Sequence, residues 1–399
     1  MGACQRSSQS SDGGAGRSTC RPYSPAWIWS AALARSIVEN SAYNPHRVRC
    51  VRTAVSRFDP VMSRVVVTGA TGFIGQHLVE HLLERGDQVT CLVRRSSPWD
   101  RRRSPQLRVC HGDLADRDSL RAAVADAEIV YHLAALVRAL DYETMLDTNA
   151  GGTRNLASVC AEMSRPPTLL LVSSLAAAGP TTNGRAVDEQ DPARPVSNYG
   201  RSKRAAELAA AAFADRLPVT IVRPPIVFGP GDRDLWQMFR SISRTHVHPV
   251  AGYRRSRFSL IDVRDLVAAL VVAAERGTRV GPDDDLRDAF ASGCYYFAQQ
   301  ERPTYEELGR RVAAAMDCRV LPIVVPAALA WSLASASDLA GRLRGQASLV
   351  NFDKLREATA GGWTCSTARA ERELGFEPPN GLDQRLRETA QWYRQAGWL

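Results

Sequence analysis

Lysine is almost missing from this chain of 399 residues, although the chain is basic. Of the 51 lysines and arginines, 49 are arginine, and the two lysines are Lys203 and Lys354. Arginine beside abundant alanine is typical of a GC-rich codon bias, so the formal net charge of +9 is weak evidence for nucleic acid, and we expect no nucleic-acid partner. With 45% hydrophobic and 23% charged residues, the composition excludes a disordered, collagenous or disulfide-stapled protein.

Paired cysteines are missing as well. The nine cysteines are scattered along the chain, with no CxxC motif and no spacing typical of metal ligands. An odd, scattered set is typical of reduced thiols in a cytosolic protein. We therefore expect a cytoplasmic chain without a metal site.

Residues 1–61 contain few acids and show no sustained apolar period. They hold eight arginines against three acids, so we expect them not to fold on their own. The apolar stretch 26–34 is too short to span a bilayer. Met62 stands shortly before the apolar run 65–67. We therefore prefer a translation start at Met62, with residues 1–61 as a wrongly assigned extension. A disordered leader and an organelle targeting signal are the alternatives.

A strand, a glycine turn and a helix follow Met62. The β-branched run 65–67 leads into Gly69, Gly72 and Gly75, and apolar residues then recur at helical spacing until Gly86. Gly69 permits a tight turn, Gly72 lets the backbone approach a pyrophosphate, and Gly75 allows the helix to pack on the strand. Further strands are predicted at βαβ spacing, at 89–93 and 107–110. The pattern predicts a dinucleotide-binding unit.

The residues after the second strand distinguish NAD from NADP. An acid there would bind the ribose 2′-hydroxyl, whereas arginine accommodates a 2′-phosphate. The chain has Arg94 and Arg95 and no acid before Asp100, so NADP is the preferred cofactor and NAD remains possible. Asp113, after the third strand, is placed to touch the adenine.

Taken together, the motifs resemble the extended short-chain dehydrogenase/reductase family, in its branch of epimerases, dehydratases and 3β-hydroxysteroid dehydrogenase-like or dihydroflavonol reductase-like enzymes. The resemblance runs from about Met62 to Leu399. It rests on TGATGFIG at 68–75, GDL at 112–114, HLAA at 132–135, NAGGT at 149–153, LVSS at 171–174, YGRSK at 199–203, RPPIVFGPGD at 223–232 and ELGFEP at 373–378.

The resemblance implies a Rossmann-type α/β fold, a doubly wound parallel sheet with a smaller, mostly helical C-terminal lobe. The dinucleotide domain is expected at 62–235 with 258–275, and the substrate lobe at 236–257 and 276–399. Besides the residues already named, the motifs imply cofactor contacts from Thr71, Phe73, Ile74, Leu114, Ala134, Ala135, Asn149, Lys203, Pro224 and Ile226.

Tyr199 and Lys203 are four residues apart and therefore share a helix face. A cation one turn away stabilises a phenolate, which brings the tyrosine nearer to proton exchange at working pH. The resemblance adds that Lys203 holds the nicotinamide ribose and that Ser174, five residues before Gly179, hydrogen-bonds the reacting oxygen. Ser174 is thereby preferred to its neighbour Ser173.

Two further polar residues fall in family motifs. Asn149 resembles the asparagine that positions the helix carrying Tyr199 and Lys203, although a polar residue at a helix start is an equal alternative. His132 is expected to be a buried histidine with satisfied hydrogen bonds and not a base.

Two positions argue against a nucleotide sugar as substrate. Relatives that bind such sugars usually carry asparagine where this chain has Ile226, and arginine where the nearest alignment has Phe258. Arg257 is one residue away, which makes the second point weaker. Apolar side chains in place of phosphate ligands favour a hydrophobic substrate.

Residues 320–337 are 18 residues without charge, but Pro322 and Pro326 weaken them as a membrane span. We expect a helix from Pro326 that covers the substrate pocket or rests on a membrane surface, with peripheral contact through 320–340. Helices are also predicted at 367–374, ending at Gly375, and at 382–398.

The sequence therefore predicts an NAD(P)-dependent oxidoreductase that interconverts a secondary alcohol and a ketone on a sterol-, hopanoid- or flavonoid-like substrate. We expect it to be a monomer or a homodimer. The alternative is a nucleotide-sugar epimerase or dehydratase that retains tightly bound NAD. A non-catalytic dinucleotide sensor is disfavoured because Tyr199 and Lys203 are both intact.

Overall fold

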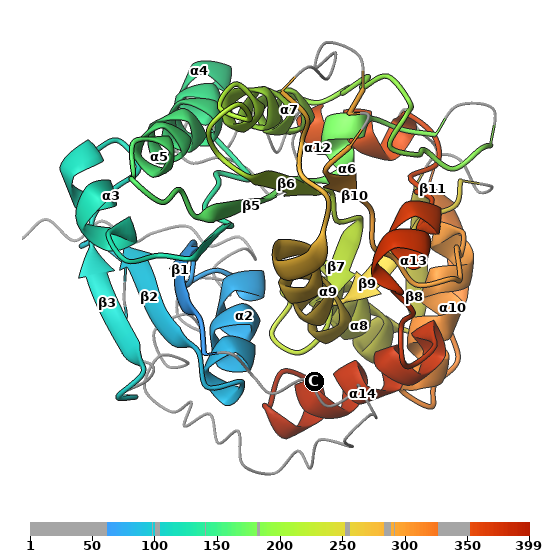
Figure 1. Ribbon diagram of the computed structural model, residues 1–399. Coiled ribbons are helices and arrows are strands. Elements are labelled where there is room, and N and C mark those ends of the chain that lie inside the picture. Colours follow the sequence, from blue (N-terminus) through green and yellow to red (C-terminus); the bar gives the residue numbers. More distant parts are fainter. Residues whose placement is uncertain are drawn as a thin grey trace, which may run out of the picture. The chain divides into compact units, whose positions relative to one another are not determined.

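The predicted βαβ unit is present in a computed structural model, which describes residues 62–97, 99, 104–139, 141–181, 184–251, 256–282, 289–290, 292–325 and 352–399. The unit consists of β1 (Arg64–Thr68), α2 (Phe73–Glu84), β2 (Gln88–Val93) and β3 (Leu107–His111) (Figure 1). Each element lies within a residue or two of its predicted bounds, because the β-branched runs and the glycines mark both ends locally.

Seven parallel strands form the central sheet, in the order β10-β6-β5-β4-β1-β2-β3. The remaining strands of this sheet are β4 (Ile129–His132), β5 (Thr168–Val172), β6 (Val219–Val222) and β10 (Cys294–Tyr295). The strand order reverses between β1 and β4, and ligands of such sheets bind outside the carboxyl ends of the strands at this point. The doubly wound α/β class is thus confirmed.

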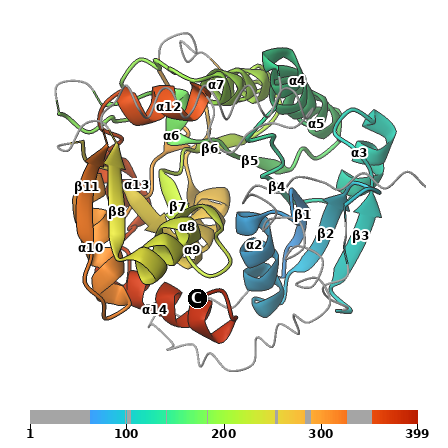
Figure 2. The same cartoon turned by 180° about the vertical axis from the view of Figure 1, so that it is seen from behind.

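Helices cover both faces of the sheet. One apolar core joins the strands to α2, α9 (Val263–Arg276) and α13 (Ala368–Leu374). A second core, on the other face, joins them to α3 (Arg117–Val124), α5 (Gly152–Ala161) and α7 (Asn198–Ala211). Figure 2 shows the same layers from behind. Four shorter helical elements are α4 (Tyr142–Leu146), the π-helix η2 (Asp147–Gly151), α6 (Leu175–Ala178) and α12 (Phe352–Thr359).

A third apolar core belongs to a smaller, mostly helical group of elements. It joins α8 (Asp234–Thr245), α10 (Tyr305–Ala315) and α14 (Leu382–Gln395). Two parallel strand pairs accompany it, β8 (Val247–Ala251) with β11 (Leu321–Val325), and β7 (Ile226–Phe228) with β9 (Leu260–Asp262). The domain boundaries stay a prediction. The range 276–399, which is expected to belong to the substrate lobe, includes β10, and this strand pairs with β6 of the main sheet.

The C-terminal helices end close to where the sequence predicts. Gly375, with a φ of 66° in the left-handed region, ends α13. The final helix ends at Gln395 and not at Trp398. Tyr393 is buried and its hydroxyl donates to Asp232 O at 2.8 Å, so this aromatic side chain packs in the core. The helix predicted from Pro326 lies outside the described residues.

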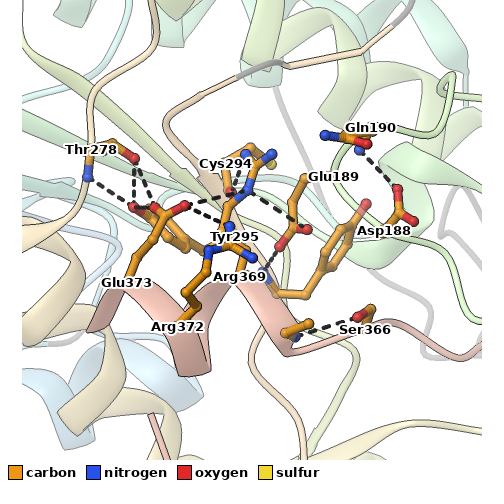
Figure 3. Close-up of polar contacts among 12 residues, drawn as sticks. Asp188, Glu189, Gln190, Thr278, Cys294, Tyr295, Ser366, Arg369, Arg372 and Glu373 are labelled. Carbon is orange, nitrogen blue, oxygen red and sulfur yellow. Dashed lines mark hydrogen bonds and ion pairs between the residues drawn. The ribbon is translucent and has the colours of Figure 1, made fainter. Parts of the chain in front are cut away.

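Polar contacts hold α13 against the edge strand β10 (Figure 3). The Tyr295 hydroxyl donates to Glu373 Oε2 at 2.7 Å and also contacts Thr278 Oγ1 at 2.6 Å. Arg369 Nη1 donates to the Cys294 carbonyl at 3.4 Å. The segment that carries the ELGFEP motif therefore fixes the edge of the sheet. In the described part of the chain, no helix is both long enough and apolar enough to cross a membrane.

Candidate active site

Two glycines at the turn between β1 and α2 lie so close to neighbouring backbone that a side chain would not fit there. Gly69 has a φ of 73°, and a Cβ added there would lie 2.7 Å from Ala134 N. A Cβ on Gly75 would lie 2.2 Å from Gly69 O. The first turn of α2 therefore packs directly on the end of β1, and the loop after β4 packs on the same turn.

The N-terminus of α2 is arranged to receive an anion. Gly72 is the N-cap without a side-chain hydrogen bond, and the first turn of α2, with Phe73, Ile74 and Gly75, contains no acid. Thr71 precedes it, and its carbonyl accepts from Gln76 Nε2 at 2.7 Å. The first N–H groups of a helix lack partners within the helix, and together with the close-packed glycines they fit the pyrophosphate of a dinucleotide. The residues present thus fit the predicted cofactor.

Arg94 and Arg95 follow β2 and are exposed. Neither side chain forms an ion pair with any residue that the structure describes. Asp113 follows β3, is exposed, and accepts from Ala115 N at 3.0 Å through Oδ1. Leu114 packs beside Gly152 at the start of α5.

The loop after β4 is fixed by a buried histidine. His132 Nδ1 lies 2.7 Å from Thr68 Oγ1, and its Nε2 lies 2.9 Å from Thr153 Oγ1. Burial lowers the pKa of His132 to about 3, so the ring is neutral and its hydrogen bonds are satisfied, as expected. Thr68 Oγ1 also accepts from Ala134 N at 3.2 Å, which holds Ala134 and the neighbouring Ala135 at the glycine turn.

Asn149 joins this loop to the helix that carries Tyr199 and Lys203. It lies within the π-helix η2, and its side chain is buried. Asn149 Nδ2 donates to Leu136 O and to Ser202 Oγ, both at 2.9 Å, and Oδ1 accepts from Leu136 N at 2.7 Å. These contacts fit the interpretation of Asn149 as a residue that positions α7.

Tyr199, Lys203 and Ser174 come together at the carboxyl end of β5. Tyr199 and Lys203 lie one turn apart on α7, and Ser174 is the N-cap of α6. Burial raises the pKa of Tyr199 to about 12, while a hydrogen bond with Ser174 lowers it. Lys203 Nζ donates to Val172 O at 2.7 Å. Burial lowers the pKa of Lys203 to about 8, and the negative charge of Glu207 opposes that shift.

The two serines at the end of β5 point to different partners. Ser173 is buried and donates to Glu207 Oε1 at 2.5 Å. Ser174 is half-buried, accepts from Ala176 N at 3.1 Å and interacts with Tyr199. Ser174, and not Ser173, is thus the serine that contacts Tyr199.

The loop after β6 completes the site. Pro224 is buried and its carbonyl accepts from Leu175 N at 2.8 Å, so the ends of β5 and β6 are joined. Ile226 begins β7 and is 40% exposed. Phe258 packs against the same apolar cluster as Tyr199. The apolar positions that the sequence singled out therefore lie on the elements around the site.

Sequence reasoning missed a buried group of charges behind these residues. Glu207, one turn beyond Lys203 on α7, is fully buried and paired with both Arg223 and Arg204. The spacing of Lys203 and Glu207 places both on one helix face, so the sequence could have indicated that Glu207 belongs to the site. It could not indicate which arginines pair with Glu207, because the chain contains many. Two acids of α12, Asp353 and Glu357, were missed as well, because 150 or more residues separate them from their partners on α7.

Comparison with known proteins places the chain in a family. Residues 65–286 match the profile of the NAD dependent epimerase/dehydratase family. The chain belongs to this family. Within it, the chain is 33% identical to the ceramide reductase of Caulobacter vibrioides over 335 residues, which cover 84% of this chain and 96% of that protein. It is 28% identical to the 3 beta-hydroxysteroid dehydrogenase/Delta 5-->4-isomerase of Mycobacterium tuberculosis, with coverage of 83% and 90%.

A solved structure shares the fold of this chain. MoeE5 in complex with UDP-glucose and NAD superposes with a TM-score of 0.63 at 26% identity, covering 84% of this chain and 99% of that chain. The resemblance to extended short-chain dehydrogenases/reductases is confirmed, and the protein is an oxidoreductase-type enzyme of that family that uses a nicotinamide cofactor.

Proposed function

We propose that this protein is an NADP-preferring oxidoreductase that interconverts a secondary alcohol and a ketone on a hydrophobic substrate. The apolar surroundings of Tyr199 carry this proposal. Tyr199 and Phe258 pack against one buried cluster, which contains Trp363. Arg257, the other residue considered as a phosphate ligand, donates instead to Arg302 O at 2.8 Å. The names of two relatives, a ceramide reductase and a 3 beta-hydroxysteroid dehydrogenase, point to the same kind of substrate.

In this proposal the side chains of the site donate and accept the proton. A bound nicotinamide supplies or accepts the hydride. The hydroxyl of Tyr199 donates a proton to the substrate oxygen on reduction and takes it back on oxidation. Its raised pKa of about 12 leaves the phenol protonated at neutral pH, which is the form that gives a proton to the substrate oxygen on reduction. Ser174 orients the same oxygen, and the cation of Lys203 stabilises the phenolate that forms transiently.

The proposed preference for NADP rests on Arg94 and Arg95. Both are exposed, at the end of the strand where the adenosine ribose of a Rossmann site lies. A guanidinium can bind a phosphate with two parallel hydrogen bonds, whereas a ribose hydroxyl gains little from it.

We also infer that the protein works in the cytoplasm at the surface of a membrane. The six cysteines of the described part are free thiols, which suits a reducing compartment. On β11, Leu321, Ile323 and Val324 are 63%, 45% and 44% exposed. Binding to vesicles of phosphatidylcholine and phosphatidylglycerol tests this, with Leu321→Ser and Ile323→Ser expected to weaken it and Met62→Ser, at another exposed apolar residue, expected to leave it unchanged.

Turnover assays with NADPH and NADP test the main proposal. The panel contains ceramides, hydroxysteroids, other lipophilic alcohols, their ketones and UDP-sugars. We expect a lipophilic pair to react, and Tyr199→Phe to lower its turnover by about 10²- to 10⁴-fold while NADPH still binds. Tyr142→Phe, on α4, is the matched control and should keep full turnover. Turnover of UDP-sugars with NAD retained by the pure protein would overturn the proposal in favour of an epimerase.

A further inference from the structure

Helix α12 reaches the catalytic helix from a distant part of the sequence. It spans Phe352–Thr359, and Figures 1 and 2 both show it beside the start of α7. The first N–H groups of any helix lack partners within the helix, so whatever accepts them fixes the helix start. In α7 this start is one residue from Tyr199.

Asp353 supplies the acceptors for two of these groups. Its Oδ1 accepts from Asn198 N at 3.0 Å, and its Oδ2 accepts from Tyr199 N at 3.1 Å. The N-cap residue Ser197 accepts from Gly200 N at 2.9 Å. One carboxylate of α12 therefore holds the backbone of the proposed acid/base residue itself, and a negative charge at a helix N-terminus is electrostatically favourable.

Glu357, one turn further along α12, holds the N-cap residue. Ser197 Oγ donates to Glu357 Oε1 at 2.6 Å. The carbonyl of Glu357 accepts from Trp363 Nε1 at 2.8 Å, and Trp363 is buried in the apolar cluster against which Tyr199 packs. The two acids thus anchor the beginning of α7 to the C-terminal segment at three hydrogen bonds.

The charged and polar groups near Tyr199 come from three elements. Lys203 lies on its own helix, Ser174 on α6, and Asp353 and Glu357 on α12. Burial is the main cause that raises the pKa of Tyr199, and the negative charge of Glu357 raises it further, whereas the hydrogen bond with Ser174 lowers it. Glu357 can be replaced without changing Tyr199, Lys203 or Ser174, and it is the acid whose charge raises the pKa of Tyr199.

We propose that Asp353 and Glu357 are positioning residues for Tyr199, through which α12 sets the place of the helix turn that carries the phenol. This inference rests on the proposed proton-transfer role of Tyr199. It assigns a task to a C-terminal segment that lies outside the region matched by the family profile, which ends at residue 286.

Tyrosinate absorbance as a function of pH tests the effect of Glu357 without any substrate. The difference between the parent protein and Tyr199→Phe isolates the ionisation of Tyr199, and the same difference is measured in the Glu357→Gln background. We expect Glu357→Gln to lower the midpoint by roughly one pH unit, because removing a nearby negative charge favours the phenolate. Glu377→Gln, an exposed acid elsewhere on the C-terminal segment, should leave the midpoint unchanged. An unchanged midpoint in Glu357→Gln would overturn the inference.

Asp353→Asn gives a second and independent readout. The amide keeps the shape of the carboxylate but turns one acceptor into a donor that faces an N–H group. We expect the amide hydrogens of Asn198 and Tyr199 to exchange about 5- to 10-fold faster, as for the loss of a helix cap, while NADPH binding is retained. Exchange at the parent rate would contradict the positioning role of Asp353.

Different results would refute the proton-transfer role of Tyr199 and the positioning role of α12. Full turnover of the reactive lipophilic alcohol by Tyr199→Phe would refute the proton-transfer role itself. Loss of turnover in Tyr199→Phe, together with parent-like titration in Glu357→Gln and parent-like exchange in Asp353→Asn, would refute only the role of α12.

Discussion

Arg223 and Glu207 form a buried two-point ion pair, in which the arginine Nε and Nη2 each lie 2.8 Å from a carboxylate oxygen. Glu207 lies one turn beyond Lys203 on α7, and Arg223 directly precedes Pro224. The pair therefore fixes α7, which carries Tyr199 and Lys203, against the loop after β6. Ser173 donates to the same carboxylate, which adds the end of β5 to this arrangement.

Loss of this ion pair should destabilise the fold. We expect Glu207→Gln to lower the free energy of unfolding by about 3 to 5 kcal/mol, because Arg223 and Arg204 would lose their buried counter-charge. Urea unfolding measures the effect. Glu128→Gln is the control, since it removes the partner of Arg64 in an exposed pair and should cost less than about 1 kcal/mol. Similar losses in both variants would contradict the assignment.

The charge of Lys203 should set an alkaline limit to turnover. Its pKa of about 8 means that it is protonated below that pH and neutral above it. We expect turnover at saturating NADPH to fall as the pH rises through this value, because neutral lysine no longer stabilises the Tyr199 phenolate. Lys203→Arg should be slower but lack this limb, since a guanidinium keeps its charge. A parent profile that stays flat through this range would refute the prediction.

Arg94 and Arg95 should discriminate between the two cofactors. We expect the double substitution Arg94→Ala with Arg95→Ala to weaken NADPH binding by about 10- to 100-fold and NADH binding only slightly, because only NADPH carries the 2′-phosphate. Titration of cofactor fluorescence measures both affinities. Arg165→Ala, at an exposed arginine before β5, is the control for the loss of charge. An equal loss for both cofactors would remove these arginines from phosphate recognition.

The glycine turn should not tolerate a methyl group at Gly75. A Cβ there would lie 2.2 Å from Gly69 O, so the first turn of α2 must shift away from β1. We expect Gly75→Ala to weaken NADPH binding by at least tenfold, since the helix N–H groups move with that turn. Gly151→Ala, where a Cβ has nothing within 4 Å, is the matched control and should bind NADPH like the parent. Parent-like affinity in Gly75→Ala would contradict the fit.

Much of the fold could be predicted because its signals are local. The β-branched run before Gly69, the helical spacing up to Gly86 and the cap at Gly375 each depend on neighbouring residues only. The same holds for Tyr199 and Lys203, because four residues along a helix place two side chains on one face. In the structure these elements begin and end within a residue or two of the predicted positions.

The rest was decided by contacts between distant segments. The hydrogen bond between Tyr199 N and Asp353 joins residues that are 154 positions apart in the sequence. The hydrogen bond between Ser197 and Glu357 joins residues that are 160 positions apart. No local periodicity encodes such pairs. Burial adds the second reason. Glu207 and Arg223 look like any solvated charges in a chain with 49 arginines, and only packing that removes them from water makes their pairing obligatory. The sequence by itself thus determined the glycine turn and the spacing of Tyr199 and Lys203, whereas the tertiary structure decided which charges hold them in place.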